Sequence, residues 1–194
     1  MSKNMAKPFL KWAGGKRQLI GELHPRLPPS IADLKTYCEP FLGGGAFLFH
    51  MLTEFNFDEV HASDINPELI LCYKQIKQTP SKVFDHLQNL ISDYPPSNPT
   101  RDEFYYDVRN SWNSNLDISS MNDNQKNERT AQTIFMNKTC FNGLFRLNQK
   151  GEFNVPTGRY TKPAFPTEEK LQEVSEAIQN VQFHLHSYEN ILNY

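Results

Sequence analysis

Three consecutive glycines, at 43–45, constrain the fold of this chain more than any other feature. They follow a strand-like segment at 36–41 and precede a segment of helical character at 46–55. Glycine lets the backbone turn sharply and approach a ligand closely. A second strand-like segment at 59–63 ends at Asp64, and a helix follows at 66–78, with Asn66 as its N-cap and Pro67 at its first position. This order predicts the opening of a doubly wound α/β sheet.

The regular alternation is interrupted after residue 80. The pattern over 83–94 predicts a helix that ends at a proline pair, and the polar run over 113–127 predicts a surface loop. Residues 128–140 predict another helix, and 144–156 predict a β-hairpin that turns at 149–151. Thr167 caps a further helix, and 181–186 alternates like a strand, with Val181, Phe183 and Leu185 on one face. We therefore predict an α/β domain that opens over 1–80, an insertion over 81–166, and a return to the first domain over 167–194.

Composition excludes several classes of protein. No apolar run approaches the roughly 18 residues of a membrane span, and no secretory signal follows the polar start of the chain. The three cysteines are far apart and in no CxxC spacing, which argues against a disulfide framework and against a zinc site. We expect a cytoplasmic protein with no metal and no membrane partner.

Positive charge is concentrated in two segments of a chain whose net charge is −2. Residues 1–17 carry five cations and no acid, and 138–162 carry five cations and one acid. Such segments on an acidic body fit a footprint for a polyanion. Ordinary clustering on a solvated face is the alternative.

The glycine turn and Asp64, 19 residues beyond Gly45, form the general arrangement that binds an adenosyl group. A glycine turn without a nucleotide is the alternative. A dinucleotide fingerprint from Gly43 would need Gly or Ala where the chain has Leu48, and a phosphate loop ending at Lys16 would need Ser or Thr where it has Arg17. Both fail, which leaves S-adenosylmethionine, a ligand without phosphates.

Four motifs in this order resemble the DNA adenine methyltransferases of the Dam type, the D12 class: FLKWAGGK at 9–16, EPFLGGGAF at 39–47, ASDIN at 62–66 and CFNGLFRLNQKGEFNVPTGRYTKPAFP at 140–166. The resemblance implies a Rossmann-like S-adenosylmethionine-dependent methyltransferase fold with an inserted helical and β-hairpin region for target recognition. It also implies site-specific methylation of the exocyclic amino group of adenine in double-stranded DNA, at a GATC-like site. Maintenance methylation and restriction–modification remain open.

The resemblance assigns a set of residues to the cofactor: Trp12, Lys16, Glu39, Phe41, Gly43, Gly45 and Asp64, with Ser187 and Tyr188 near the adenine. The chemistry agrees, because a sulfonium cation favours aromatic and acidic neighbours. Lys16 and the amides at 14–15 suit the methionine carboxylate. A core aromatic is the plain alternative for Trp12.

The resemblance also assigns a set of residues to DNA: Lys11, Phe141, Asn142, Leu144, Arg146, Asn148, Asn154, Pro156 and Arg159. Arg146 is the expected base reader, because arginine can contact guanine through two hydrogen bonds. Leu144 and Pro156 would touch base edges, the three asparagines would contact backbone or bases, and Phe141 could wedge between bases where the family often has tyrosine. A solvated basic hairpin without DNA is the alternative.

Related enzymes clamp a flipped adenine with an Asp/Asn-Pro-Pro-Tyr/Phe motif, expected one strand after 181–189. The only Pro-Pro pairs of this chain, at 28–29 and 95–96, have neither the preceding acid or amide nor the following aromatic. We therefore expect a chain truncated before this motif, with no catalytic residue and no activity alone, and with its first strand at a sheet edge. It could be a remnant that still binds DNA, or one half of a split enzyme completed by a C-terminal fragment. An unrelated nucleotide-dependent enzyme is disfavoured by the two failed fingerprints.

Overall fold

The computed structural model of the chain describes residues 6–193. The first five residues of the predicted basic segment 1–17 lie outside the described residues. Three parallel strands form one sheet in the order β1 (Thr36–Glu39), β2 (Glu59–Asp64) and β3 (Val181–Leu185). Because Glu39 pairs with Ala62 and Asp64 pairs with Leu185, the carboxyl ends of the three strands meet at one edge of the sheet.

Helices α2 (Ala46–Glu54) and α3 (Pro67–Gln78) follow β1 and β2, which confirms the predicted order of strand, glycine turn, helix, strand and helix. The Asn66 side chain caps α3 by accepting hydrogen bonds from the N–H groups of Glu68 and Leu69. Strand β1 lies at the edge of the described sheet, as expected.

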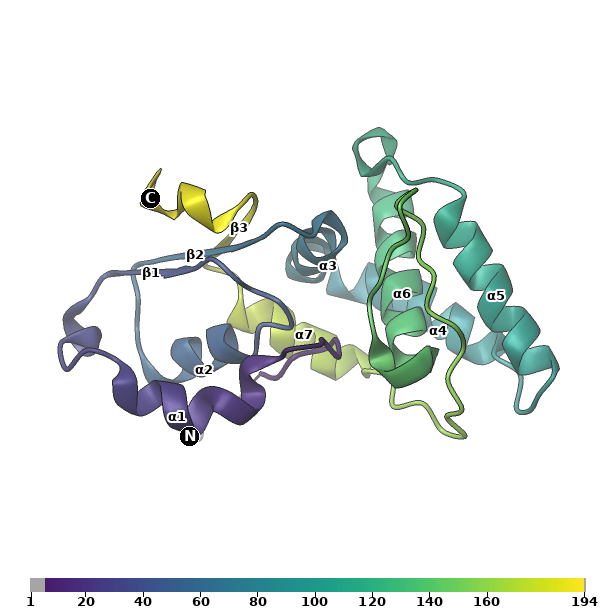
Figure 1. Cartoon of the computed structure of the whole chain (residues 1–194), viewed down its shortest axis with the longest axis horizontal. Coiled ribbons are helices and arrows are strands. Elements are labelled where there is room, and N and C mark those ends of the chain that lie inside the picture. Colours follow the sequence, from purple (N-terminus) through teal and green to yellow (C-terminus); the bar gives the residue numbers. More distant parts are fainter. Residues whose placement is uncertain (1–5, 194) are drawn as a thin grey trace.

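The sheet is covered mainly on one face. In Figure 1, α1 (Ile20–Leu23), α2 and α7 (Glu168–Ala177) lie below it, and the C-terminal turn (Tyr188–Asn193) lies above. Val181 and Phe183 of β3 are buried, as the alternation predicts, but Leu185 is exposed. The predicted strand is confirmed as β3, and Leu185 is exposed because it stands at the last pair of the sheet.

Helices α4 (Pro80–Asp93), α5 (Thr100–Asn113) and α6 (Asp123–Thr139) form a helical region to the right of the sheet in Figure 1. The loop predicted over 113–127 is wrong in its last part, because α6 begins at Asp123. Asn122 and Gln125 form a capping box, in which each side chain accepts the backbone N–H of the other at 2.9–3.0 Å. Polar composition concealed this helix start.

The segment 144–156 makes antiparallel contacts without a regular strand. Leu147 and Phe153 form an antiparallel bridge, and the Asn154 N–H donates to the Arg146 carbonyl at 3.1 Å. The turn is held by Asn148, whose Oδ1 accepts the N–H groups of Lys150 and Glu152 at 2.9 and 3.0 Å. The predicted hairpin is thus present as a chain reversal, with few ladder hydrogen bonds.

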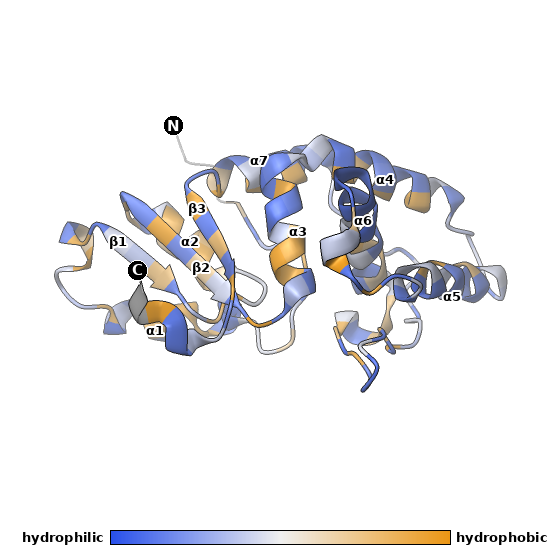
Figure 2. Ribbon diagram, turned by 90° about the horizontal axis from the view of Figure 1, so that it is seen from above, coloured by the Kyte–Doolittle hydropathy of each residue, from blue (hydrophilic) through white to orange (hydrophobic). Residues whose placement is uncertain are grey.

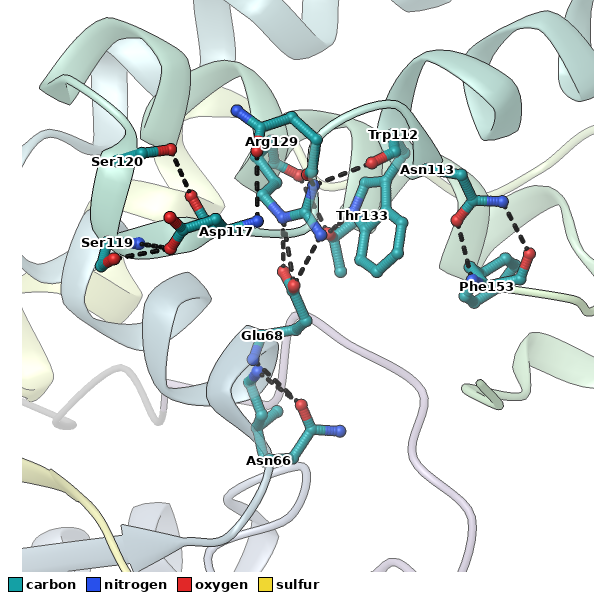
Figure 3. Close-up of polar contacts among 12 residues, drawn as sticks. Asn66, Glu68, Trp112, Asn113, Asp117, Ser119, Ser120, Arg129, Thr133 and Phe153 are labelled. Carbon is teal, nitrogen blue, oxygen red and sulfur yellow. Dashed lines mark hydrogen bonds and ion pairs between the residues drawn. The ribbon is translucent and has the colours of Figure 1, made fainter. Parts of the chain in front are cut away.

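The sheet and the helical region share one hydrophobic core. Helix α3 lies between them, with its apolar residues visible in Figure 2, and the core runs from Val60 and Phe183 through Tyr73 to Ile134 on α6. A buried ion pair adds to this junction. The Arg129 guanidinium of α6 contacts the Glu68 carboxylate of α3 at 2.7 Å (Figure 3). The division at residues 80 and 166 stays a prediction.

Candidate functional site

An acid and a glycine turn meet at the carboxyl edge of the sheet. The Gly43 N–H donates to Asp64 Oδ2 at 2.9 Å, and the Asn66 N–H donates to Oδ1 at 3.0 Å. Gly43 and Gly45 both have positive φ, 51° and 72°. At Gly45 there is also no room for a side chain, because a Cβ there would overlap the buried Tyr73 hydroxyl. The glycine turn is therefore fixed against Asp64 from one side and against α3 from the other.

Trp12 forms a wall beside the glycine turn. Its indole Cδ1 lies 3.2 Å from the position a Cβ would take at Gly43, and its carbonyl accepts the Gly15 N–H at 3.1 Å. The other side of the indole stacks on Phe145, with ring centroids 5.4 Å apart and an interplanar angle of 23°. Trp12 thus lies between the glycine turn and the hairpin segment.

Lys16 is engaged with the end of β1. Its ammonium donates to Glu39 Oε1 at 2.9 Å and to the Phe41 carbonyl, and the Tyr37 hydroxyl donates to Glu39 Oε2 at 2.6 Å. Burial raises the pKa of Glu39 above its ordinary value, while Lys16 and Tyr37 act in the opposite direction. In this arrangement Lys16 anchors Glu39, and its contact with a ligand carboxylate stays a prediction.

Trp12, Lys16, the glycine turn and Asp64 line one cavity of about 220 Å³, which is bounded by residues 12–16, 41–46 and Asp64. Pockets that enclose a whole small ligand measure roughly 300–1,000 Å³. The cavity therefore suits one part of a ligand, and the rest would extend over the rim.

The rim is apolar and exposed. Phe41, Ile65 and Tyr188 are 58%, 75% and 52% exposed, and the rings of Phe41 and Tyr188 lie 5.4 Å apart. Sequence reasoning missed Ile65, although an apolar residue directly after Asp64, on the strand's carboxyl end, was the available signal. Ser187 lies in the turn before Tyr188 and accepts the Glu189 N–H at 3.5 Å.

A second cavity, of about 610 Å³, shares the wall formed by Trp12, Gly14 and Gly15. Its cationic lining comes from both basic segments: Lys7, Lys11, Arg17 and Lys138. Burial, and after it the charge of Lys11, lowers the pKa of Lys138 to about 8. This accumulation of positive charge suits an anionic ligand.

The residues assigned to DNA differ in how free their side chains are. Arg146 is exposed, and its Nε donates to Asn154 Oδ1 at 2.7 Å. Asn148 is occupied by the turn, because its amide nitrogen also donates to Glu152 at 2.7 Å. Several others are exposed near the basic cavity or the hairpin: Lys11, Phe141, Asn142, Pro156 and Arg159. Leu144 is half-buried.

Among residues 6–193, no group of three or more His, Cys, Asp or Glu side chains is placed to hold a metal ion. Over the same part of the chain, no helix combines the length and the apolar character needed to cross a membrane.

Comparison with known proteins gives a consistent result. A sequence model of the D12 class N6 adenine-specific DNA methyltransferases matches residues 12–194. The chain is 44% identical to the type II methyltransferase M.MjaIII of Methanocaldococcus jannaschii, over 97% of this chain and 64% of the relative. It is 35% identical to the type II methyltransferase M1.LlaDCHI of Lactococcus lactis subsp. cremoris, over 90% of this chain and 55% of the relative. The chain is also 35% identical to the DNA adenine methylase of Escherichia coli K12, over 97% of this chain and 59% of the relative. The chain thus spans about three-fifths of the length of these relatives.

Proposed function

Because the chain belongs to the D12 class of N6 adenine-specific DNA methyltransferases, we propose that it forms the cofactor-binding wall and the DNA-recognition surface of such an enzyme. The observation that carries this proposal is the pair of cavities on either side of the wall at Trp12, Gly14 and Gly15. One cavity holds the acid and the glycine turn, and the other is lined by cations.

The first cavity suits S-adenosylmethionine. Each Asp64 oxygen accepts one backbone N–H and keeps a further lone pair for a ribose hydroxyl. Trp12, which lines the cavity, offers an aromatic face that is favourable beside a sulfonium cation. Buried Glu39 would act indirectly, by holding Lys16 at 2.9 Å in the cavity wall. The exposed rings of Phe41 and Tyr188, with Ile65, would hold the adenine outside the enclosed part. When bound, the cofactor supplies the methyl group.

The second cavity and the hairpin suit double-stranded DNA. Lys11, Arg17 and Lys138 would contact phosphates, which position the duplex without reading its sequence. Arg146, exposed on the hairpin, would read guanine in the major groove. For the whole protein we propose methyl transfer from S-adenosylmethionine to the exocyclic amino group of adenine at a GATC-like site.

Calorimetric titration with S-adenosylmethionine tests the cofactor site. We expect the chain to bind it, and Asp64→Asn to weaken binding at least about tenfold, the effect of about 1.4 kcal/mol, because one hydrogen bond to a carboxylate is lost. Asp58→Asn is the matched control, since Asp58 is exposed and forms an ion pair with exposed Lys35 at 3.7 Å. Failure of the wild-type chain to bind, or equal weakening by both substitutions, would refute the assignment.

Fluorescence anisotropy with a labelled duplex tests DNA recognition. The wild-type chain should prefer a duplex with GATC over one with the same four bases permuted. Arg146→Ala should remove the preference, because one bidentate contact discriminates by about 1–3 kcal/mol. Lys150→Ala, at the exposed turn, should weaken binding of both duplexes to the same extent. Equal wild-type affinity for the two duplexes would contradict the GATC-like target.

A further inference from the structure

Asn137 joins the turn that opens the hairpin to the dipeptide at 11–12, whose two residues the proposed function assigns to different ligands, Lys11 to DNA and Trp12 to the cofactor. This asparagine lies on α6 and is 2% exposed. Its Nδ2 donates to the Lys11 carbonyl at 2.8 Å, and its Oδ1 accepts the Lys11 N–H at 2.8 Å. The same Nδ2 donates to the Gly143 carbonyl at 3.0 Å. One buried amide therefore satisfies both backbone groups of Lys11 and also holds the turn that opens the hairpin.

The neighbours of Lys11 leave it little freedom. A Cβ at Gly143 would lie 2.6 Å from the Lys11 Cδ, so the side chain passes directly over this glycine. The Lys11 ammonium lies 4.5 Å from the centroid of the Tyr160 ring. Lys11 is thereby held on three sides, by Asn137 of α6, by Gly143 and by Tyr160.

Trp12, the next residue, carries the same constraint into the cofactor cavity. Its indole packs between Phe145 of the hairpin segment and Gly43 of the glycine turn. Since Lys11 and Trp12 are consecutive, fixing the backbone of Lys11 also fixes where the indole can lie. Any displacement of the hairpin would move Phe145 and Gly143 together and so disturb both residues.

We propose that Asn137 is a positioning residue that couples cofactor binding to DNA binding. It holds the dipeptide at 11–12 in the one arrangement where Trp12 bounds the cofactor cavity and Lys11 bounds the basic cavity. Because this dipeptide is held as one unit, a ligand that settles against one of its residues also sets the position of the other, and each ligand raises the affinity for the other by the same factor, as linkage requires. This inference rests on the proposed function.

The coupling factor is the direct test. The dissociation constant of S-adenosylmethionine is measured calorimetrically, without DNA and with a saturating GATC duplex. For the wild-type chain we expect DNA to tighten binding by at least about fivefold, within the usual range of coupling between sites. Asn137→Ala and Asn137→Asp should bring this factor close to one. Aspartate still accepts the Lys11 N–H but can no longer donate to the two carbonyls.

Asn127→Ala is the matched control, because Asn127 is a buried asparagine of the same helix, 1% exposed, that accepts a hydrogen bond from Thr79 Oγ1 at 2.7 Å. It should lower stability without changing the coupling factor. If Asn137→Ala does not fold, Phe145→Leu serves instead, since it removes the stack on Trp12 from a half-buried position.

The outcomes separate the two proposals. A wild-type chain that binds both ligands with a coupling factor of one overturns this inference and leaves the proposed function intact. A coupling factor that survives in the Asn137 variants, or that falls equally in Asn127→Ala, also overturns it. A wild-type chain that binds neither ligand refutes the proposed function and this inference together.

Discussion

Breaking the buried ion pair between α3 and α6 should cost this protein a large part of its stability. Arg129 donates to both Glu68 oxygens at 2.7–3.1 Å, and both side chains are buried. Its Nη1 also donates to the carbonyls of Trp112 and Asn115 at 2.9 and 2.7 Å, and its guanidinium lies 3.8 Å from the Trp112 ring centroid. Figure 3 shows these contacts converging on one guanidinium.

Arg129→Met keeps most of the side-chain volume and removes the charge. An isolated buried carboxylate left by such a change costs about 3–5 kcal/mol. Loss of the hydrogen bonds to the two carbonyls adds about 1–3 kcal/mol for each that stays buried without a partner. We therefore expect the free energy of unfolding to fall by at least about 4 kcal/mol. With a urea m-value of about 2 kcal/mol/M, the midpoint falls by about 2 M.

Urea titration followed by far-ultraviolet circular dichroism measures this midpoint. Glu68→Leu combined with Arg129→Met should recover a good part of the loss, because removing both charges leaves no unpaired buried ion. Lys170→Met is the control. Lys170 and Glu173 form a more exposed pair at 3.0 Å on α7, of a kind that contributes at most about 1 kcal/mol. A loss below about 1 kcal/mol for Arg129→Met would refute this reasoning, because the buried pair would then be no stronger than a surface one.

Two further predictions concern the two cavities, and a third concerns methyl transfer. Gly45→Ala should abolish cofactor binding and destabilise the fold by about 1–3 kcal/mol, because φ is 72° and the new Cβ would meet Tyr73. Calorimetry measures the binding and thermal unfolding measures the stability. Gly21→Ala, whose Cβ would meet nothing within 4 Å, should change neither binding nor stability. DNA affinity should fall as pH rises through about 8, because Lys138 then loses its proton. Anisotropy measures this pH dependence of affinity, which should disappear in Lys138→Arg because arginine stays charged. An unchanged pH dependence in Lys138→Arg would contradict the assignment of Lys138 to DNA binding. The 194-residue chain, which has no Asp/Asn-Pro-Pro-Tyr/Phe sequence, should transfer no tritiated methyl group to duplex DNA beyond a Trp12→Ala variant.

Local signals in the sequence predicted the parts of the fold that depend on neighbouring residues. Asn66 and Pro67 mark the start of α3 because an N-cap and its helix are adjacent in the chain. The meeting of Gly43 with Asp64 also followed, since parallel strands bring their carboxyl ends to one edge. The start of α6 was missed because the capping box of Asn122 and Gln125 lies in a run that is otherwise typical of a loop.

The contacts that close the site could not be read from sequence. Asn137 and Lys11 are 126 residues apart, and no spacing rule relates them. Lys16 was expected to face a ligand, but its position beside buried Glu39 depends on the sheet edge. Ile65 stood within a recognised motif, yet its exposure is a property of the folded rim.

The shared wall at Trp12 limits how this protein could be redesigned. One indole borders both the glycine turn and the hairpin segment, so its two sides cannot be reshaped independently. On the proposed function, a substitution that alters DNA specificity by displacing Phe145 would therefore also alter cofactor binding. Arg146 and the turn residues Gln149 and Lys150 are exposed, so on that proposal they are the positions at which to engineer new specificities.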